Sequence, residues 1–146
     1  MNGVNATPSA DAAALTARLA GEKFVSLVTY RRSGEPVATP MWIVRDGERL
    51  SAWTPADSWK VKRARRDGRV TLRACGRTGK VDAGEPVLTG RAEVVTDRGE
   101  VARVEHLVKQ KYGFEFRVMT LIEAVVARGR KDRVLLRISP TSTKES

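Results

Sequence analysis

A short basic run holds the residues of this sequence that are best suited to binding chemistry. Residues 54–66 read TPADSWKVKRARR, and their cationic side chains are Lys60, Lys62, Arg63, Arg65 and Arg66. Thr54 and Pro55 match the start of a helix, as the N-cap and the first helical residue. We therefore predict a helix over 55–66, with Gly68 just beyond its end.

The start of this helix would offer a seat for a phosphate group. Free backbone N–H groups and the positive end of the helix dipole attract anions there. The hydroxyls of Thr54 and Ser58 add two hydrogen-bond donors. Lys60 supplies a point charge one turn in, and Arg63 shares its face because it is three residues further on. Lys60 and Arg63 are the predicted phosphate ligands, with Trp59 as a groove wall or a stacking partner.

Three interpretations of the basic run stay open: a solvated helix face, a nucleic-acid patch, and the seat of a phosphate-bearing cofactor. The protein has 27 Lys and Arg against 17 Asp and Glu, a formal net charge of +10, which favours an anionic partner. Single-stranded nucleic acid would need several exposed aromatic side chains among the cations. This run has only Trp59, so we expect no nucleic-acid partner. Lys62, Arg65 and Arg66 point to other faces of the helix and are expected to be solvated or to contact an anionic tail.

A second candidate site is Thr39-Pro40-Met41, within an expected strand over 36–46. Proline cannot donate a hydrogen bond to a β-ladder, so Pro40 marks an edge, a bulge or a binding surface. The pattern fits both a ring-binding strand and an ordinary edge strand with Met41 in the core. Tyr112 is a further candidate, for closing the groove.

One cysteine, Cys75, and one histidine, His106, exclude several classes of site. A single cysteine cannot form an intrachain disulfide, and without a Cys/His cluster we expect no metal site. No apolar run is long enough to span a bilayer, and the N-terminal residues lack the basic start and apolar core of a signal peptide. We therefore expect a cytoplasmic protein without membrane spans.

The 146 residues suit one compact domain of mainly β structure with helices, an α+β fold. We expect a tail and short helix over 1–20, a single domain over 21–140, and a C-terminal tail over 141–146. The expected strands cover 24–30, 36–46, 49–54, 69–75, 85–96 and 132–139, with helices over 55–66, 97–111 and 115–127. Gly90 falls inside a long strand and predicts a bulge or a bend. Short strands joined by tight turns are typical of a small antiparallel barrel.

The order of these motifs resembles the pyridoxamine-phosphate-oxidase-like split barrels, a superfamily of flavin and deazaflavin oxidoreductases. The similarity is clear over residues 22–96 and looser over 97–139. It is carried by a G-E-P turn, the strand TPMWIV, the turn DGERL, a T-x-x-x-S-x-K opening of the basic helix, R-x-G-R-V-T-L, and GEPVLTGRAEVV. Within the superfamily, the chain looks most like small actinobacterial-type proteins that bind coenzyme F420. It lacks the arginine-rich C-terminal signature of the true oxidase.

The resemblance implies a six-stranded antiparallel split barrel that forms a homodimer, with the cofactor in a groove at the dimer interface. It places the cofactor phosphate at the helix after the third strand, near Thr54, Ser58 and Lys60, and the ring against the strand that carries Pro40. The implied function is a reductase that transfers a hydride from reduced F420 to an electron-poor small molecule. The rivals are an FMN-dependent oxidoreductase of the same fold and a carrier that binds F420 without turnover. No catalytic residue is predicted, because the cofactor performs the difficult step.

Overall fold

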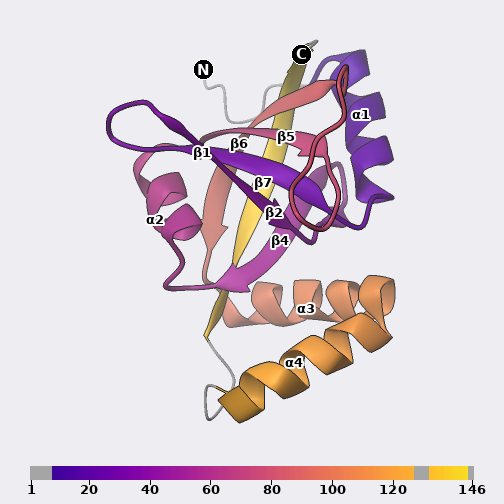
Figure 1. The fold of residues 1–146 in the computed structure, drawn as a ribbon, viewed down its shortest axis with the longest axis vertical. Coiled ribbons are helices and arrows are strands. Elements are labelled where there is room, and N and C mark those ends of the chain that lie inside the picture. The colour runs from indigo at the N-terminus through magenta and orange to yellow at the C-terminus, as the bar shows by residue number, and fades with distance from the viewer. Residues whose placement is uncertain (1–7, 127–131, 145–146) are drawn as a thin grey trace.

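The computed structural model describes residues 8–126 and 132–144 and contains one antiparallel β-sheet with four helices (Figure 1). The strands are β1 (Val25–Tyr30), β2 (Pro36–Met41), β3 (Val44–Asp46), β4 (Arg49–Pro55), β5 (Arg69–Ala74), β6 (Val87–Val95) and β7 (Arg133–Lys144). The helices are α1 (Ala10–Ala20), α2 (Trp59–Arg66), α3 (Arg98–Tyr112) and α4 (Phe114–Val126). The sheet order is β2-β1-β5-β6-β7-β4-β3. This is the α+β split-barrel fold that the sequence predicts, with one strand more than expected.

The additional strand arises because the expected strand over 36–46 is interrupted. Met41 is the last residue of β2 and pairs with Val25 of β1, whereas Val44 begins β3 and pairs with Ser51 of β4. The two pieces therefore lie at opposite edges of the sheet order. Pro40 lies in the edge strand β2, where a residue without an N–H is tolerated. The connector between the two strands, Trp42 and Ile43, crosses from one edge to the other.

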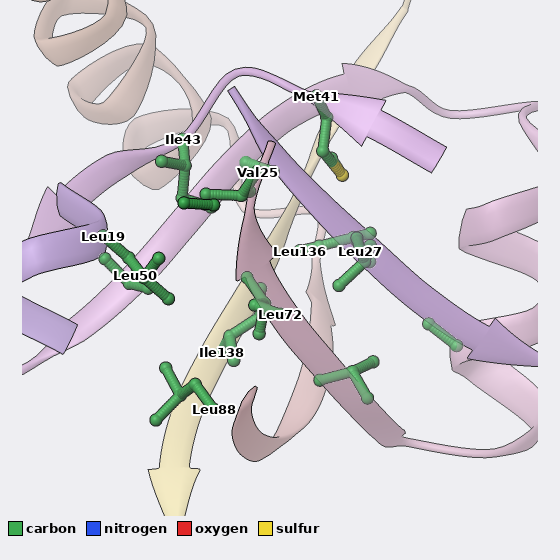
Figure 2. Close-up of a cluster of buried hydrophobic side chains, with 14 of the residues drawn as sticks. Leu19, Val25, Leu27, Met41, Ile43, Leu50, Leu72, Leu88, Leu136 and Ile138 are labelled. Atoms are coloured by element: carbon green, nitrogen blue, oxygen red, sulfur yellow. The ribbon is translucent and has the colours of Figure 1, made fainter. Parts of the chain in front are cut away.

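The strands enclose a hydrophobic core that α1 and α2 cover (Figure 2). Leu27, Leu72, Leu136 and Ile138 lie at its centre and are at most 1% exposed. Leu19 adds the apolar face of α1 to the same cluster. Alternation of apolar residues along each strand produces this core, since successive side chains point to opposite faces.

A second, smaller cluster lies between the sheet and the helices α3 and α4, which form a separate layer beside the barrel (Figure 1). Val104 and Val108 of α3 pack with Phe116 of α4 against Trp53 and Leu135. The sheet is therefore covered on both of its faces at β4 and β7. None of the described helices is long and apolar enough to cross a membrane.

Strand β7 is longer than the sequence predicts. The expected strand ends at Ser139, but the ladder continues through Pro140, which lies opposite Gly90, to Lys144, which lies opposite Val87. The expected C-terminal tail is therefore wrong as far as Lys144, because a proline placed at a bulge does not end a strand. The bulge itself is confirmed by a register shift between Thr89 and Gly90.

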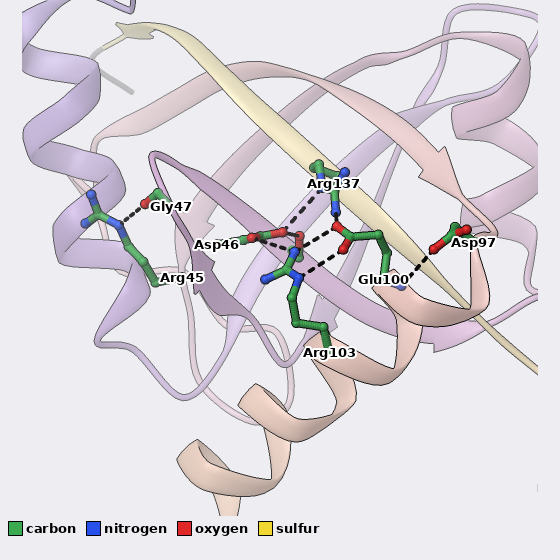
Figure 3. Close-up of polar contacts among 8 residues, drawn as sticks. Arg45, Asp46, Gly47, Asp97, Glu100, Arg103 and Arg137 are labelled. Carbon is green, nitrogen blue, oxygen red and sulfur yellow. Dashed lines mark hydrogen bonds and ion pairs between the residues drawn. The ribbon is translucent and has the colours of Figure 1, made fainter.

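A polar network joins α3 to the sheet (Figure 3). The carboxylate of Asp46 accepts hydrogen bonds from Ser51 Oγ at 2.7 Å and from Arg103 at 3.0 Å. Arg137 contacts both Asp46 and Glu100, and Arg103 also reaches Glu100 at 3.0 Å. Two carboxylates and two guanidinium groups thus neutralise one another across β3, β7 and the first turn of α3.

This network makes the stability of the fold sensitive to acid. Hydrogen bonds from Arg103 and Arg137 lower the pKa of Glu100 to about 2, against about 4.3 in an unfolded chain. The unfolded chain therefore takes up a proton first, and the contribution of Glu100 is complete above about pH 4.5 and lost as the pH falls to about 2. We expect Glu100→Gln to flatten this part of the stability–pH curve, measured by urea unfolding. Glu48→Gln, in the exposed turn before β4, is the control and should leave the slope unchanged.

Candidate cofactor site

A small cavity of about 180 Å³ lies where β2, β4, α2 and α4 meet. Its lining residues are Met41, Trp42, Trp53, Thr54, Pro55, Lys60 and Met119. We call this cavity the Lys60 notch. Three of the residues that the sequence predicts as cofactor ligands line it together, namely Met41, Thr54 and Lys60. The remaining lining residues add apolar and aromatic walls.

The predicted helix start at Thr54 is wrong. Thr54 and Pro55 are the last residues of β4 and pair with Val134 and Arg133 of β7. The helix begins at Trp59, with Ser58 in the N-cap position but without a hydrogen bond from its side chain to the helix. Pairing with the central strand β7 outweighs the local helix-start pattern, as tertiary contacts often do.

This difference leaves two buried hydroxyls without partners in the structure. Thr54 is 2% exposed, and neither its Oγ1 nor the Oγ of Ser58 makes a hydrogen bond among the described residues. A buried polar group without a partner destabilises the fold by about 1–3 kcal/mol, so such groups call for an explanation. Two free hydroxyl donors near a helix start suit the oxygens of a phosphate group.

Lys60 completes this donor set with a positive charge. Burial lowers the pKa of Lys60, and the nearby charges of Arg63 and Arg133 lower it further. The ammonium group is therefore held where the loss of surrounding water and the neighbouring cations disfavour its charge. An anion in the notch would remove that cost. The residues present thus fit a phosphate-bearing cofactor.

Two other predicted ligands, Arg63 and Trp59, do not line the Lys60 notch. Arg63 is three residues from Lys60, but its Nε donates to Thr29 Oγ1 at 2.7 Å, and its side chain lines a different hollow together with Trp59. Trp59 is 69% exposed and forms no wall of the Lys60 notch. The structure therefore separates the predicted pair of phosphate ligands.

The residues of the second candidate site, Thr39-Pro40-Met41, do not all lie at the Lys60 notch. Met41 lines the Lys60 notch and is 9% exposed. Thr39 is half-buried and pairs with Leu27, while Pro40 is exposed on the opposite face of β2. Only Met41 of the three predicted residues therefore lies at the notch, although Thr39 shares its face by strand alternation.

The sequence does not reveal how the connector between β2 and β3 is held. Trp42 stacks on Tyr112 with ring centroids 4.2 Å apart and planes 10° from parallel. The hydroxyl of Tyr112 accepts from Ile43 N at 3.0 Å and donates to Lys23 O at 2.7 Å. The predicted groove-closing tyrosine is thus buried beneath the connector and supports Trp42, a wall of the notch.

Lys111 supports the same connector from the end of α3. Its Nζ donates to the carbonyl oxygens of Ala20, Glu22 and Ile43 at 2.9, 2.6 and 2.6 Å. Burial lowers the pKa of Lys111 to about 8. No sequence pattern distinguishes this lysine from others in α3, because its partners are backbone groups of distant segments.

We expect Tyr112→Phe to destabilise the fold by about 2 kcal/mol, because the substitution removes the acceptor of the buried N–H of Ile43 and the donor to the part-buried carbonyl of Lys23. The lowered midpoint of urea unfolding would measure this loss. Tyr30→Phe is the matched control, since no hydrogen bond of the Tyr30 hydroxyl is found among the described residues, and it should change the midpoint little. Equal effects of the two substitutions would contradict the role given to the Tyr112 hydroxyl.

The antiparallel sheet, the interrupted strand and the notch beside α2 together define a split barrel with a candidate cofactor site. A family model described as pyridoxamine 5'-phosphate oxidase matches residues 12–145. The chain belongs to this pyridoxamine 5'-phosphate oxidase family of split-barrel proteins.

Solved structures with low sequence identity share the fold. One described as an F420 reductase is 18% identical over 94% of this chain and 98% of its own, with a TM-score of 0.59. The conserved hypothetical protein Rv2991 from Mycobacterium tuberculosis is 23% identical over 96% and 89%, with a TM-score of 0.67. HutZ, a haem storage protein from Vibrio cholerae, is 14% identical over 85% and 86%, with a TM-score of 0.62. A search of curated proteins finds no match to this chain.

Proposed function

We propose that this protein is a reductase that uses reduced coenzyme F420 to transfer a hydride to an electron-poor small molecule in the cytoplasm. The observation that carries the proposal is the Lys60 notch, where the buried hydroxyl of Thr54, which has no partner among the described residues, lines the same cavity as a desolvated lysine of α2. An F420 reductase with the same fold supports it.

In this proposal the cofactor supplies the hydride chemistry, and the protein binds, orients and shields it. Thr54 and Ser58 donate hydrogen bonds to the phosphate, and Lys60 provides the opposite charge. Met41 and Trp42 form the wall on which the ring system lies, with the connector held in place by Tyr112. We assign no proton donor to the acceptor.

A second copy of the chain would complete the groove. The Lys60 notch has a volume of about 180 Å³, whereas sites for ligands of cofactor size usually have about 300–1,000 Å³. One protomer therefore offers room for the phosphate end and part of the ring. Next to Met119 of the notch, α4 exposes apolar side chains, namely Phe114, Val118, Leu121, Ile122 and Val125. Such a patch is typical of an interface, and we propose a homodimer, which sedimentation analysis would test.

FMN is the alternative cofactor, because a single phosphate also fits the notch. F420 additionally carries an anionic tail, and the basic surface of this protein favours such a tail. A carrier function is the other alternative, since one protein with this fold is described as a haem storage protein and the fold alone does not require turnover.

A fluorescence titration with F420 and, separately, with FMN tests the proposal. Tight binding of F420 alone supports it, and a screen of electron-poor acceptors with reduced F420 then distinguishes a reductase from a carrier. A preference for FMN would move the protein to the flavin-dependent members of the family. Binding of neither would remove the proposed function and leave the fold assignment intact.

A further inference from the structure

A second hollow, of about 760 Å³, lies on the other side of α2 from the Lys60 notch. Its lining residues are Arg31, Arg32, Ser33, Trp59, Lys62, Arg63 and Arg66. We call it the basic hollow. Figure 1 shows its two sides, the turn between β1 and β2 and the adjacent helix α2, which lie next to each other although they are far apart in the sequence.

All five charged side chains that line the basic hollow are cationic. Arg31 is paired with Glu35 at 3.5 Å, and both of these side chains are largely exposed, so the pair neutralises little of the charge. Burial lowers the pKa of Arg63, and the charge of Arg31 lowers it further. The cations therefore repel one another, and an anion bound among them would relieve that repulsion.

Several of these side chains are already held in place. Arg63 Nε donates to Thr29 Oγ1 at 2.7 Å, and Arg66 donates to the carbonyl of Tyr30. Lys62 Nζ lies 4.4 Å from the centre of the Trp59 ring. Fixed cations lose less conformational entropy when a ligand binds, and this increases affinity.

We propose that the basic hollow binds a small molecule that carries two or more phosphate or carboxylate groups. Four of its five cations are arginines, whose planar guanidinium groups make paired hydrogen bonds with both kinds of anion. One anionic group could neutralise only part of this charge, whereas a chain of them would contact both the turn and the helix. The inference goes beyond the cofactor phosphate at Lys60 and does not depend on the identity of the cofactor.

Isothermal titration at constant ionic strength would test this proposal, with tripolyphosphate and triglutamate as the two oligoanions and orthophosphate as the single anion. We expect at least one oligoanion to bind more tightly than orthophosphate. The double variant Arg32→Ala/Arg66→Ala should weaken that binding roughly tenfold. The matched control, Arg49→Ala/Lys80→Ala, removes the same charge from exposed positions outside the hollow and should leave binding unchanged.

The outcomes separate this site from the proposed cofactor site. Equal losses in the two double variants, or no preference for oligoanions, would overturn the proposal. The proposal would also be overturned if a single-stranded RNA oligonucleotide bound more tightly than either oligoanion and this binding depended on Arg32 and Arg66. Lys60→Ala should leave oligoanion binding intact, so a failure of cofactor binding does not decide this result. If Arg32→Ala/Arg66→Ala does not fold, Arg32→Ala/Lys62→Ala removes the same charge.

The same variants identify the source of the anion. If Arg32→Ala/Arg66→Ala weakens binding of F420 but not of FMN, the hollow holds the anionic tail of the cofactor. If it weakens neither cofactor and only the oligoanion, the hollow serves a separate ligand. Both results support an oligoanion site.

Discussion

Lys60→Ala is expected to weaken cofactor binding about 100-fold, which corresponds to about 2.7 kcal/mol. The substitution removes the charge that shares the Lys60 notch with the buried hydroxyl of Thr54, where a phosphate group would be largely shielded from water. Charge-assisted hydrogen bonds in such places are about twice as strong as neutral ones. The dissociation constant, obtained from cofactor fluorescence, measures the effect.

Lys62→Ala is the control for this result. Lys62 lies two residues away on the same helix, but it is exposed and packs on the Trp59 ring. Its removal lowers the net charge by the same amount and should weaken the binding of FMN, which has no anionic tail to reach the basic hollow, by less than about threefold, as for other exposed charges. Similar losses in both variants would show that overall charge, and not a phosphate pocket, drives binding.

Gly90→Ala is expected to destabilise the fold by about 3 kcal/mol. A Cβ atom at Gly90 would lie 2.8 Å from the carbonyl oxygen of Ser139 and 3.1 Å from Cγ2 of Ile138. The first contact is with backbone of the central strand β7, so it cannot be relieved by rotating a side chain, and overpacking of this kind is costly. Urea unfolding would show the loss as a lower midpoint.

Gly76→Ala provides the matched control. A Cβ atom at Gly76 would meet nothing within 4 Å, and Gly76 is not among the glycines with positive φ. The substitution should therefore leave stability unchanged or raise it slightly, because alanine reduces the entropy of the unfolded chain. A large loss at Gly76, or none at Gly90, would contradict the close approach at the bulge.

Local patterns predict those parts of the fold in which neighbouring residues decide the structure. The alternation in 24–30 and 69–75 corresponds to β1 and β5, and the glycine within a long strand correctly predicts the bulge at Gly90. The α3 and α4 boundaries differ from the predicted ones by one residue. These elements follow from periodicity, which requires no knowledge of distant partners.

The errors occur where distant segments decide the structure. Thr54 has the local pattern of a helix cap but pairs with Val134, which is 80 positions further along the chain. Likewise Pro140 has the pattern of a strand end but lies opposite Gly90. In both cases a tertiary ladder overrides a local preference that is worth about 1 kcal/mol.

The same distinction applies to the candidate site. The type of residue and the hydroxyl–lysine spacing predict Thr54, Ser58 and Lys60 as ligands, and of these Thr54 and Lys60 line the Lys60 notch whereas Ser58 does not. Helical spacing also groups Arg63 with Lys60, but the hydrogen bond to Thr29 directs Arg63 to the other side of α2. The support from Tyr112 and Lys111 consists of contacts with backbone atoms, which leave no pattern in the sequence.

The position of β7 also determines how the barrel can be assembled during synthesis. The first six strands form two separate sets, β2-β1-β5-β6 and β4-β3, and only β7 pairs with both. Until β7 emerges, β4 and β6 each present an unpaired edge, which is a template for association with other chains. Closure of the barrel is thus a late event between segments that are distant in the sequence, and such closures are slow. A nascent chain interrupted before Arg133 would expose both edges at once and depend on chaperones to stay unaggregated.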